Sequence, residues 1–188
     1  MHLTYRKTCR VCGSLALTPV IDLGDQYLQG SFLKPGKEMP PMRRISTEIV
    51  RCNPMVDENA CGLLQTAISV PSEILYSSYW YRSGTNQTMR DHLKSIANEA
   101  ESLSCKSNAV VLDIGCNDGS FLESLKASGY NNVFGIEPTQ DSFKLAEKKN
   151  LNVQHSFFTQ ATAKDFYETK SFDIVITRQV LEHISDLD

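Results

Sequence analysis

The chain has 188 residues, of which 41% are hydrophobic and 22% charged, and its formal net charge at pH 7 is −3. This length fits one or two domains of ordinary globular composition. The slightly acidic balance, without a long run of Lys or Arg, argues against nucleic acid as the main partner. No apolar stretch is long enough to cross a membrane and no signal-peptide core begins the chain, so we expect a cytoplasmic protein without a membrane partner.

Four of the six cysteines fall in the first third of the chain, in two pairs. The first pair, Cys9-Arg-Val-Cys12, is followed by Gly13 and has the shape of a zinc knuckle, in which a tight turn aims two thiolates at one point. The second pair, Cys52 and Cys61, has eight residues between its members instead of two. Turn-forming residues in that interval would return Cys61 beside Cys52.

These cysteines predict a structural zinc ion. In a cytoplasmic protein, grouped cysteines are metal ligands or thiols more often than disulfides. Four thiolates make a closed tetrahedral site without a position for substrate, so we assign the metal no catalytic role. The alternative is four unrelated buried thiols, and His2 and Asp57 rank behind the cysteines as ligands. The rest of this region is expected to form short strands, with turns at 22–25 and 34–37.

The sequence pattern divides the chain into three parts. Residues 1–70 are the expected zinc-binding module. Residues 71–106 are an aromatic and helical bridge, in which the stretch YSSYWYRSGTNQTMR precedes a helix whose apolar positions follow the helical period as far as Leu103. Residues 107–188 alternate strands and helices, which is typical of a parallel α/β sheet.

Residues 109–122, AVVLDIGCNDGSFL, join a strand to a helix through a turn that contains two glycines. The aliphatic run 109–114 is broken only by Asp113, as in a strand buried on both faces of a parallel sheet. A helix is expected at 120–128. We expect the turn to approach a ligand closely and the helix to offer it free N–H groups. Further strands are expected near 132–136, 151–155 and 172–176.

The glycine spacing separates the candidate ligands. Gly115 is followed only by Gly119, so the turn lacks the third glycine of a dinucleotide fingerprint and the Lys of a P-loop. The stretch VLDIGCNDGSFL instead resembles motif I of Rossmann-like S-adenosylmethionine methyltransferases. That resemblance implies that the turn cradles the amino-acid part of the cofactor. Glu137, which ends the 132–136 strand, is then placed to accept hydrogen bonds from both ribose hydroxyls. An ordinary α/β turn with a solvated Glu is the alternative.

The order of the parts resembles a narrower family, the sugar C-methyltransferases with an N-terminal zinc-binding domain. The four cysteines carry the resemblance, together with the stretches VIDLGDQ, YWYRSGTNQTMRDH, VLDIGCNDGSFL, GIEP and RQVLEHISD. Two features depart from the family pattern. The second knuckle has an enlarged loop, and Tyr27-Leu-Gln-Gly30 stands where relatives often carry a Pro-Leu-Ala-Asn-like run.

This resemblance implies an α/β fold, with a small zinc-binding N-terminal module followed by a truncated Rossmann-like class I methyltransferase domain. It implies S-adenosylmethionine and Zn²⁺ as cofactors and a nucleotide-linked keto-deoxysugar as the small-molecule substrate. The cofactor-binding residues that it implies are Asp113, Gly115, Cys116, Asn117, Gly119, Glu137, Pro138, Phe158 and Thr177.

The stretch SFDIVITRQVLEHISD carries the expected chemistry. It is predicted to be a strand that enters a helix, with Gln179 and His183 on one helical face. C-methylation requires removal of a proton beside a ketone, and histidine can act as an acid or a base near neutral pH. The family resemblance implies a catalytic role for His183, with Tyr79 and Tyr81 of the bridge facing the same site. The alternatives are a packing role for His183 and a half-buried aromatic strip for the tyrosines.

The methyltransferase sheet of this family has strand order 3-2-1-4-5-7-6, and the sequence ends after the fourth expected strand. We therefore expect the N-terminal portion of a longer chain, with a missing C-terminal half as its partner and little activity by itself. Other function classes stay open. They are a dehydrogenase, a non-catalytic zinc-containing fragment that binds a cofactor, and a methyltransferase for oxygen or nitrogen acceptors.

Overall fold

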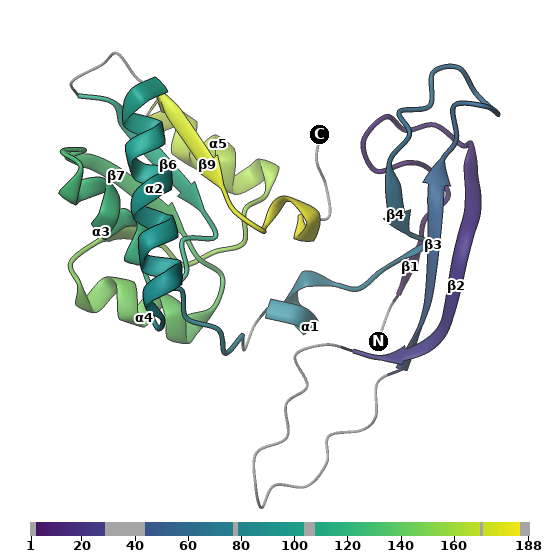
Figure 1. Cartoon of the computed structure of the whole chain (residues 1–188), viewed down its shortest axis with the longest axis horizontal. Helices are drawn as coiled ribbons and strands as arrows, with labels where there is room; N and C mark the ends of the chain where they lie inside the picture. Colours follow the sequence, from purple (N-terminus) through teal and green to yellow (C-terminus); the bar gives the residue numbers. More distant parts are fainter. Residues whose placement is uncertain (1–2, 29–43, 77–78, 104–107, 170, 185–188) are drawn as a thin grey trace, which may run out of the picture. The chain divides into compact units, whose positions relative to one another are not determined.

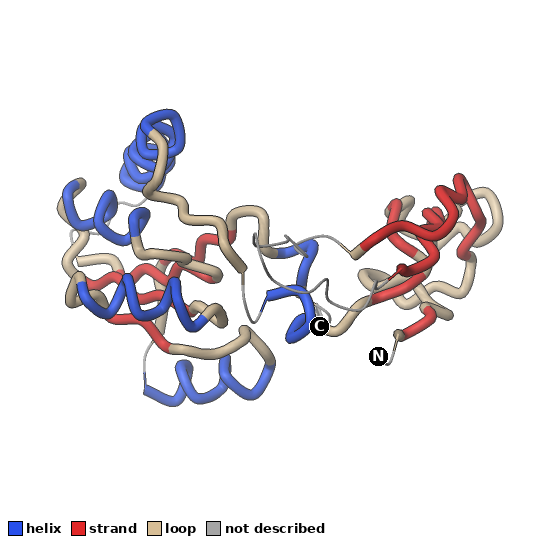
Figure 2. Tube along the Cα trace, turned by 90° about the horizontal axis from the view of Figure 1, so that it is seen from below, coloured by secondary structure: helices blue, strands red, loops and turns tan. Residues whose placement is uncertain are grey.

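The computed structural model describes residues 3–28, 44–76, 79–103, 108–169 and 171–184. The chain divides into two compact units, one of Met1–Leu75 with Ser185–Asp188 and one of Tyr76–Ile184. Each unit has its own β-structure, drawn as arrows in Figure 1 and in red in Figure 2. The predicted turn at 34–37, Gly30, His2 and Cys105 lie outside the described residues.

The first unit is built from antiparallel strands. β2 (Leu17–Tyr27), β3 (Arg44–Cys52) and β4 (Leu64–Thr66) form a sheet in the order β2-β3-β4, and β1 (Thr4–Tyr5) pairs with β5 (Ile68–Ser69). The short helix α1 (Ser72–Tyr76) follows at the end of this unit.

The apolar core beside the cysteines of the first unit is small. It contains two cysteines and two alanines, Cys9, Ala16, Cys52 and Ala60, with Leu17 and Leu63 partly buried against them. Cysteine and alanine side chains bury little apolar area, and small modules of this kind usually need a disulfide or a metal ion to be stable. We therefore expect this unit to need a metal ion or a covalent link at its cysteines in order to be stable.

The predicted turn at 22–25 is wrong. β2 continues through it, and the pairing with β3 shifts register between Asp22 and Asp25. Gly24 has φ 66°, and its N–H donates to the Asp22 carboxylate at 2.8 Å. The glycine and the short polar side chain thus make a bulge inside one long strand instead of a chain reversal.

The second unit contains a parallel sheet in the order β8-β7-β6-β9. Its strands are β6 (Val110–Ile114), β7 (Asn132–Ile136), β8 (Asn152–Gln154) and β9 (Ile174–Thr177). All three pairings are parallel. This order, 3-2-1-4 in chain order of the strands, confirms the predicted Rossmann-like α/β architecture.

Apolar side chains cover both faces of this sheet. One cluster joins Val111 of β6 to residues of α2 (Gln87–Leu103), α3 (Ser120–Ala127) and α4 (Gln140–Lys148). On the opposite face, Leu112 and Ile114 pack with aromatic residues in a second cluster. Figure 1 shows α2 running beside α3 over the strands. The helix α5 (Gln160–Thr169) connects β8 to β9. No helix in the described part of the chain has the length and hydropathy of a membrane span.

The helix predicted after β9 is also wrong. Up to residue 184, where the described part of the chain ends, a single 3-10 turn forms there, η1 (Leu181–His183), and Gln179 has φ 54°. A residue in the left-handed region cannot be part of a right-handed helix, so Gln179 and His183 do not share a helical face. The turn brings Val180 over Gly115, which is a tertiary contact that the local sequence pattern does not reveal.

Candidate metal centre and cofactor site

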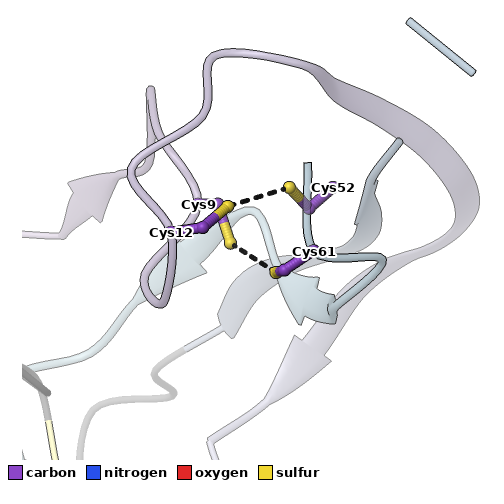
Figure 3. Close-up of side chains that lie close together, drawn as sticks. All are labelled: Cys9, Cys12, Cys52 and Cys61. Carbon is purple, nitrogen blue, oxygen red and sulfur yellow. Dashed lines mark hydrogen bonds between the residues drawn. The ribbon is translucent and has the colours of Figure 1, made fainter. Parts of the chain in front are cut away.

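The four predicted metal ligands lie together in the first unit. Their sulfur atoms all lie within 4.8 Å of one another, with 3.6 Å between Cys9 and Cys61 and 3.5 Å between Cys12 and Cys52. Figure 3 shows the four thiols pointing toward a common centre. Tetrahedral zinc with Zn–S bonds of about 2.3 Å places sulfurs roughly 3.8 Å apart. The cysteine arrangement therefore fits a structural zinc ion.

Each cysteine pair ends on a glycine with a left-handed backbone. Gly13 has φ 71° and Gly62 has φ 82°, and the Gly13 N–H donates to the Cys9 carbonyl at 3.0 Å. A β-carbon at Gly13 would meet nothing within 4 Å. The glycines are therefore required by the backbone conformation of the two knuckles, not by crowding.

The enlarged loop of the second knuckle is held in shape by two of its own side chains. Asn53 accepts a hydrogen bond from the Met55 N–H at 2.9 Å, and Asp57 accepts one from the Asn59 N–H at 3.0 Å. The second Asp57 oxygen accepts a hydrogen bond from the Ser14 hydroxyl at 2.6 Å, which ties this loop to the first knuckle. Asp57 thus closes the loop and lies outside the four-cysteine cluster.

The environment of the four thiols is electrostatically uneven. Backbone N–H groups of Ser14 and Cys61 lower the pKa of Cys12 to about 6, whereas burial raises the pKa of Cys52 to about 11. Four thiolates at these distances repel one another, so all four can be ionised together only around a cation. A divalent metal ion would supply that charge.

In the second unit, the N–H groups of the turn between β6 and α3, residues 115–120, all donate hydrogen bonds to acceptors within the protein. The N–H groups of Gly115 and Cys116 both donate to the Ile136 carbonyl, at 2.8 and 3.0 Å, and that of Gly119 donates to the Cys116 carbonyl. The next three have side-chain acceptors: Asn117 N–H donates to Glu137, Asp118 N–H to Asn117 Oδ1, and Ser120 N–H to Asp118. The N–H groups from Gly115 to Ser120 are therefore used within the protein, and the expected N–H donors to a ligand would have to come from elsewhere in the first turn of α3.

The two glycines of this turn are required by packing inside the protein. At Gly115, with φ 74°, a β-carbon would lie 2.5 Å from a methyl group of Val180. At Gly119, with φ 76°, it would lie 2.3 Å from a methyl group of Leu151. Packing inside the protein is thus already enough to exclude larger residues at both positions. Cys116 is buried in the same region and packs against Gly135.

The predicted ribose acid is a buried carboxylate with two backbone donors. Glu137 is only 4% exposed. Its Oε2 accepts from the Asn117 N–H at 2.8 Å, and its Oε1 accepts from the Thr139 N–H at 2.7 Å. Each carboxylate oxygen can accept a further hydrogen bond, so the group can still bind a pair of hydroxyls.

The remaining predicted cofactor residues differ in exposure. Pro138 follows Glu137, and its carbonyl lies 3.0 Å from Nε2 of His155. Phe158 is partly buried in the apolar cluster that contains Leu112 and Ile114. Thr177 is exposed at the end of β9, opposite Ile114 in the register. Only Glu137 and Asp113 among the predicted residues bring a buried carboxylate to this end of the sheet.

Asp113 forms a buried ion pair. Its side chain is fully buried, and Oδ2 lies 2.9 Å from a guanidinium nitrogen of Arg178, which also packs over the Phe121 ring at 4.3 Å. Within the described residues, Oδ1 has no hydrogen-bond partner. Burial raises the pKa of Asp113 to about 6, although the Arg178 cation opposes this. An unpartnered buried carboxylate oxygen suits a cationic group such as an ammonium.

A segment of the bridge, which we call the strap (Tyr79–Asn86), is hydrogen-bonded to the same turn. The Asn117 side chain accepts from the Ser83 N–H and donates to the Tyr81 carbonyl, each at 3.1 Å. Gly84 N–H donates to the Asp118 carboxylate at 3.0 Å. Sequence reasoning missed this contact, because the two segments are more than thirty positions apart along the chain.

His183 has an aromatic neighbour that the sequence reasoning did not select. Its ring lies 4.8 Å from that of Tyr76, between centroids. Tyr76 in turn packs against Tyr79 at 5.9 Å, and Tyr79 lies 6.4 Å from Tyr81. Burial raises the pKa of Tyr76 to about 12, so its hydroxyl is a proton donor at neutral pH. The tyrosine-rich composition of the bridge was the available signal, but it could not rank one tyrosine above another.

Comparison with family models matches both parts of the chain. Residues 9–76 match a family described as "Putative zinc binding domain", and residues 81–188 match one described as "Methyltransferase domain". The second match covers more than half of the chain.

Individual relatives share the methyltransferase part. A ubiquinone biosynthesis O-methyltransferase from Rhodopseudomonas palustris is 33% identical over 92 residues, which cover 47% of this chain and 35% of the relative. EEF1A lysine methyltransferase 2 from Danio rerio is 32% identical over 94 residues, covering 46% and 38%. The chain thus spans about a third of the length of the curated relatives it matches. The crystal structure of a SAM dependent methyltransferase from Archaeoglobus fulgidus is similar with 31% identity and a TM-score of 0.37, over 46% of this chain and 37% of that one.

The metal centre generates the first prediction. Elemental analysis should find about one zinc ion per chain, and Cys52→Ser should release it and unfold the first unit, because the small core cannot hold the two knuckles together. Met55→Ser is the matched control, since Met55 is 90% exposed on the same loop. Metal-free protein with the same melting curve before and after Cys52→Ser would contradict the assignment.

The Asp113 pair generates a prediction about pH. The pKa of Asp113 is about 6 in the folded chain, above an unfolded value of about 3.9. The stability that Asp113 contributes is therefore complete below about pH 4, where the group is protonated in both states. It is lost as pH rises through 6, because the buried carboxyl must then ionise. Relative to Asp113→Asn, the free energy of unfolding of the parent should fall by about 1–3 kcal/mol between pH 4 and pH 7. Urea unfolding at both pH values measures this, with Asp91→Asn, an exposed change, as the control. Parallel pH curves for parent and Asp113→Asn would show that Asp113 has an ordinary pKa.

Proposed function

The chain belongs to the methyltransferase-domain family that its residues 81–188 match, and on this premise we propose that its second unit binds S-adenosylmethionine for methyl transfer. The bound cofactor would supply an electrophilic methyl group on a sulfonium. The residues that would hold it are Glu137, toward the ribose, and the turn between β6 and α3 with Asp113, toward the amino-acid end. The zinc ion proposed for the first unit would be structural.

The observation that carries this proposal is the charge of the site. Asp113, Asp118 and Glu137 bring three carboxyl groups to the turn, while Arg178 pairs with Asp113. S-adenosylmethionine carries an ammonium and a sulfonium, both positive, so acceptors and negative charge favour it. The Asp113 oxygen without a partner in the described residues is buried, and it adds unneutralised acceptor character beside the turn.

The same geometry disfavours a dehydrogenase. A dinucleotide places its pyrophosphate on free N–H groups at a helix N-terminus. In this chain the N–H groups from Gly115 to Ser120 already have acceptors within the protein. The turn is thus better suited to the cationic cofactor.

For the acceptor, we propose a carbon beside the ketone of a nucleotide-linked deoxysugar. The support is the resemblance across the whole chain and the contact between His183 and Tyr76. His183 would take the proton from carbon, and a tyrosine hydroxyl would donate a hydrogen bond to the developing enolate oxygen. The enolate carbon would then bond to the methyl group while the bond from methyl to sulfur breaks. The two curated relatives described above are named for other acceptors, an O-methyltransferase and a lysine methyltransferase, so they do not support a carbon acceptor.

The cofactor proposal is tested at Glu137. Glu137→Gln keeps the size of the side chain but removes its charge, and it should weaken S-adenosylmethionine binding by about 1–3 kcal/mol, because charge-assisted hydrogen bonds to the ribose are lost. Titration calorimetry measures the effect even where the parent binds weakly. Glu147→Gln, an exposed change on α4, is the control. Equal affinity in parent and Glu137→Gln would show that the ribose binds elsewhere.

The acceptor proposal is tested by solvent exchange. In an active preparation of the enzyme, His183→Asn should slow exchange of the proton beside the ketone about 10²- to 10⁴-fold, while cofactor affinity is kept. His92→Asn, an exposed change on α2, should leave exchange unchanged. Exchange at the parent's rate in His183→Asn would make His183 a packing residue. Cofactor binding without transfer to any ketosugar would favour the non-catalytic alternative.

A further inference from the structure

Asn117 is the residue through which the strap and the proposed ribose acid are connected. Its main-chain N–H donates to Glu137 at 2.8 Å. Its side-chain Oδ1 accepts from the Ser83 N–H, and its Nδ2 donates to the Tyr81 carbonyl. One residue thus carries hydrogen bonds to the cofactor carboxylate on one side and to the aromatic strap on the other.

Asn117 has little freedom to move away from these hydrogen-bond partners. The residue is 9% exposed and has φ 54°, a left-handed conformation that asparagine adopts more readily than most residues. The strap is also packed closely on the turn, since a β-carbon at Gly84 would lie 2.3 Å from the Ser120 hydroxyl. A small displacement of the turn must therefore move the strap or break these hydrogen bonds.

We propose that Asn117 is a positioning residue that couples occupancy of the cofactor site to the conformation of the strap. The inference rests on the proposed function. A ribose bound to Glu137 would fix the Asn117 backbone, and the Asn117 side chain would then fix the strap at Tyr81 and Ser83. The rings of Tyr79 and Tyr81 belong to that strap, so the surface proposed to face the acceptor is completed when the cofactor binds.

This coupling has a thermodynamic consequence. If the cofactor orders the strap, then the ordered strap strengthens cofactor binding by the same factor, because coupling between two sites is reciprocal. Each of cofactor and acceptor would then raise the affinity of the chain for the other. A purely structural Asn117 would stabilise the fold but would not transmit cofactor binding to the strap, and this difference can be measured.

The chain has a built-in probe for the strap. Trp80 is its only tryptophan, and its side chain is 59% exposed. Titration with S-adenosylmethionine should change Trp80 fluorescence in the parent, with the midpoint that calorimetry gives. The test variant is Asn117→Gly, which keeps the left-handed backbone and removes only the side chain. Asn150→Gly is the matched control, because Asn150 is exposed and has φ 55°.

Asn117→Gly should still bind S-adenosylmethionine by calorimetry, about 5- to 30-fold more weakly, while its fluorescence change at saturating cofactor falls to less than about half of the parent's. Asn117→Asp keeps one acceptor and loses the donor to Tyr81, so its fluorescence change should be intermediate. Asn150→Gly should match the parent in both measurements.

The outcomes separate the inference from the proposed function. A parental fluorescence change in Asn117→Gly, or no change in a parent that binds the cofactor, overturns the coupling and leaves the cofactor site intact. No binding heat in the parent overturns both. If circular dichroism shows Asn117→Gly to be unfolded, Asn117→Asp decides, and a full parental fluorescence change in that variant overturns the coupling.

Discussion

The buried carboxylate of Glu137 holds together the two turns at the carboxyl ends of β6 and β7. A carboxylate removed from water is costly unless hydrogen bonds replace its hydration, and here the N–H groups of Asn117 and Thr139 do so. Because Asn117 also holds the strap, one acid determines the position of three segments. The cofactor, in our proposal, would bind to an acid that is already held in place, so the conformational response to binding would fall on the strap.

The first unit depends on a different constraint. Its β-sheet is long, but its buried cluster consists of small side chains, so the cysteines must contribute stability through what they bind. The contact between Ser14 and Asp57 shows how a loop of eight residues can replace a tight knuckle without displacing Cys61. The longer interval between Cys52 and Cys61 is therefore accommodated by side chains of the loop that hydrogen-bond to its backbone and to Ser14.

Much of the second unit could be predicted from local patterns. The strands β6 and β7, the helix α3 and the position of Glu137 follow from apolar runs and glycine breaks, because each is determined within a few neighbouring residues. The N–H groups of the turn could not be predicted in this way. Three of them, from Gly115 to Asn117, have acceptors at the end of the next strand and just after it, Ile136 and Glu137, about twenty positions away. The helix predicted to contain Gln179 was wrong for a similar reason. Val180, the next residue, packs against Gly115 far away in the sequence, and Gln179 has a left-handed backbone instead of a helical one. The roles of the catalytic candidates, the domain boundaries at 70 and 106, and the cytoplasmic location stay predictions.

The most direct test of the central claim is an NMR titration of the ¹⁵N-labelled chain with S-adenosylmethionine. If Glu137 binds the ribose, the hydrogen bonds to its two oxygens must change in strength, so the amide resonances of Asn117 and Thr139 should move among the furthest in the second unit. The amides of Ser83 and Gly84 in the strap should follow with the same saturation. Saturable shifts elsewhere in the parallel sheet, with Asn117 and Thr139 unchanged, would contradict the account.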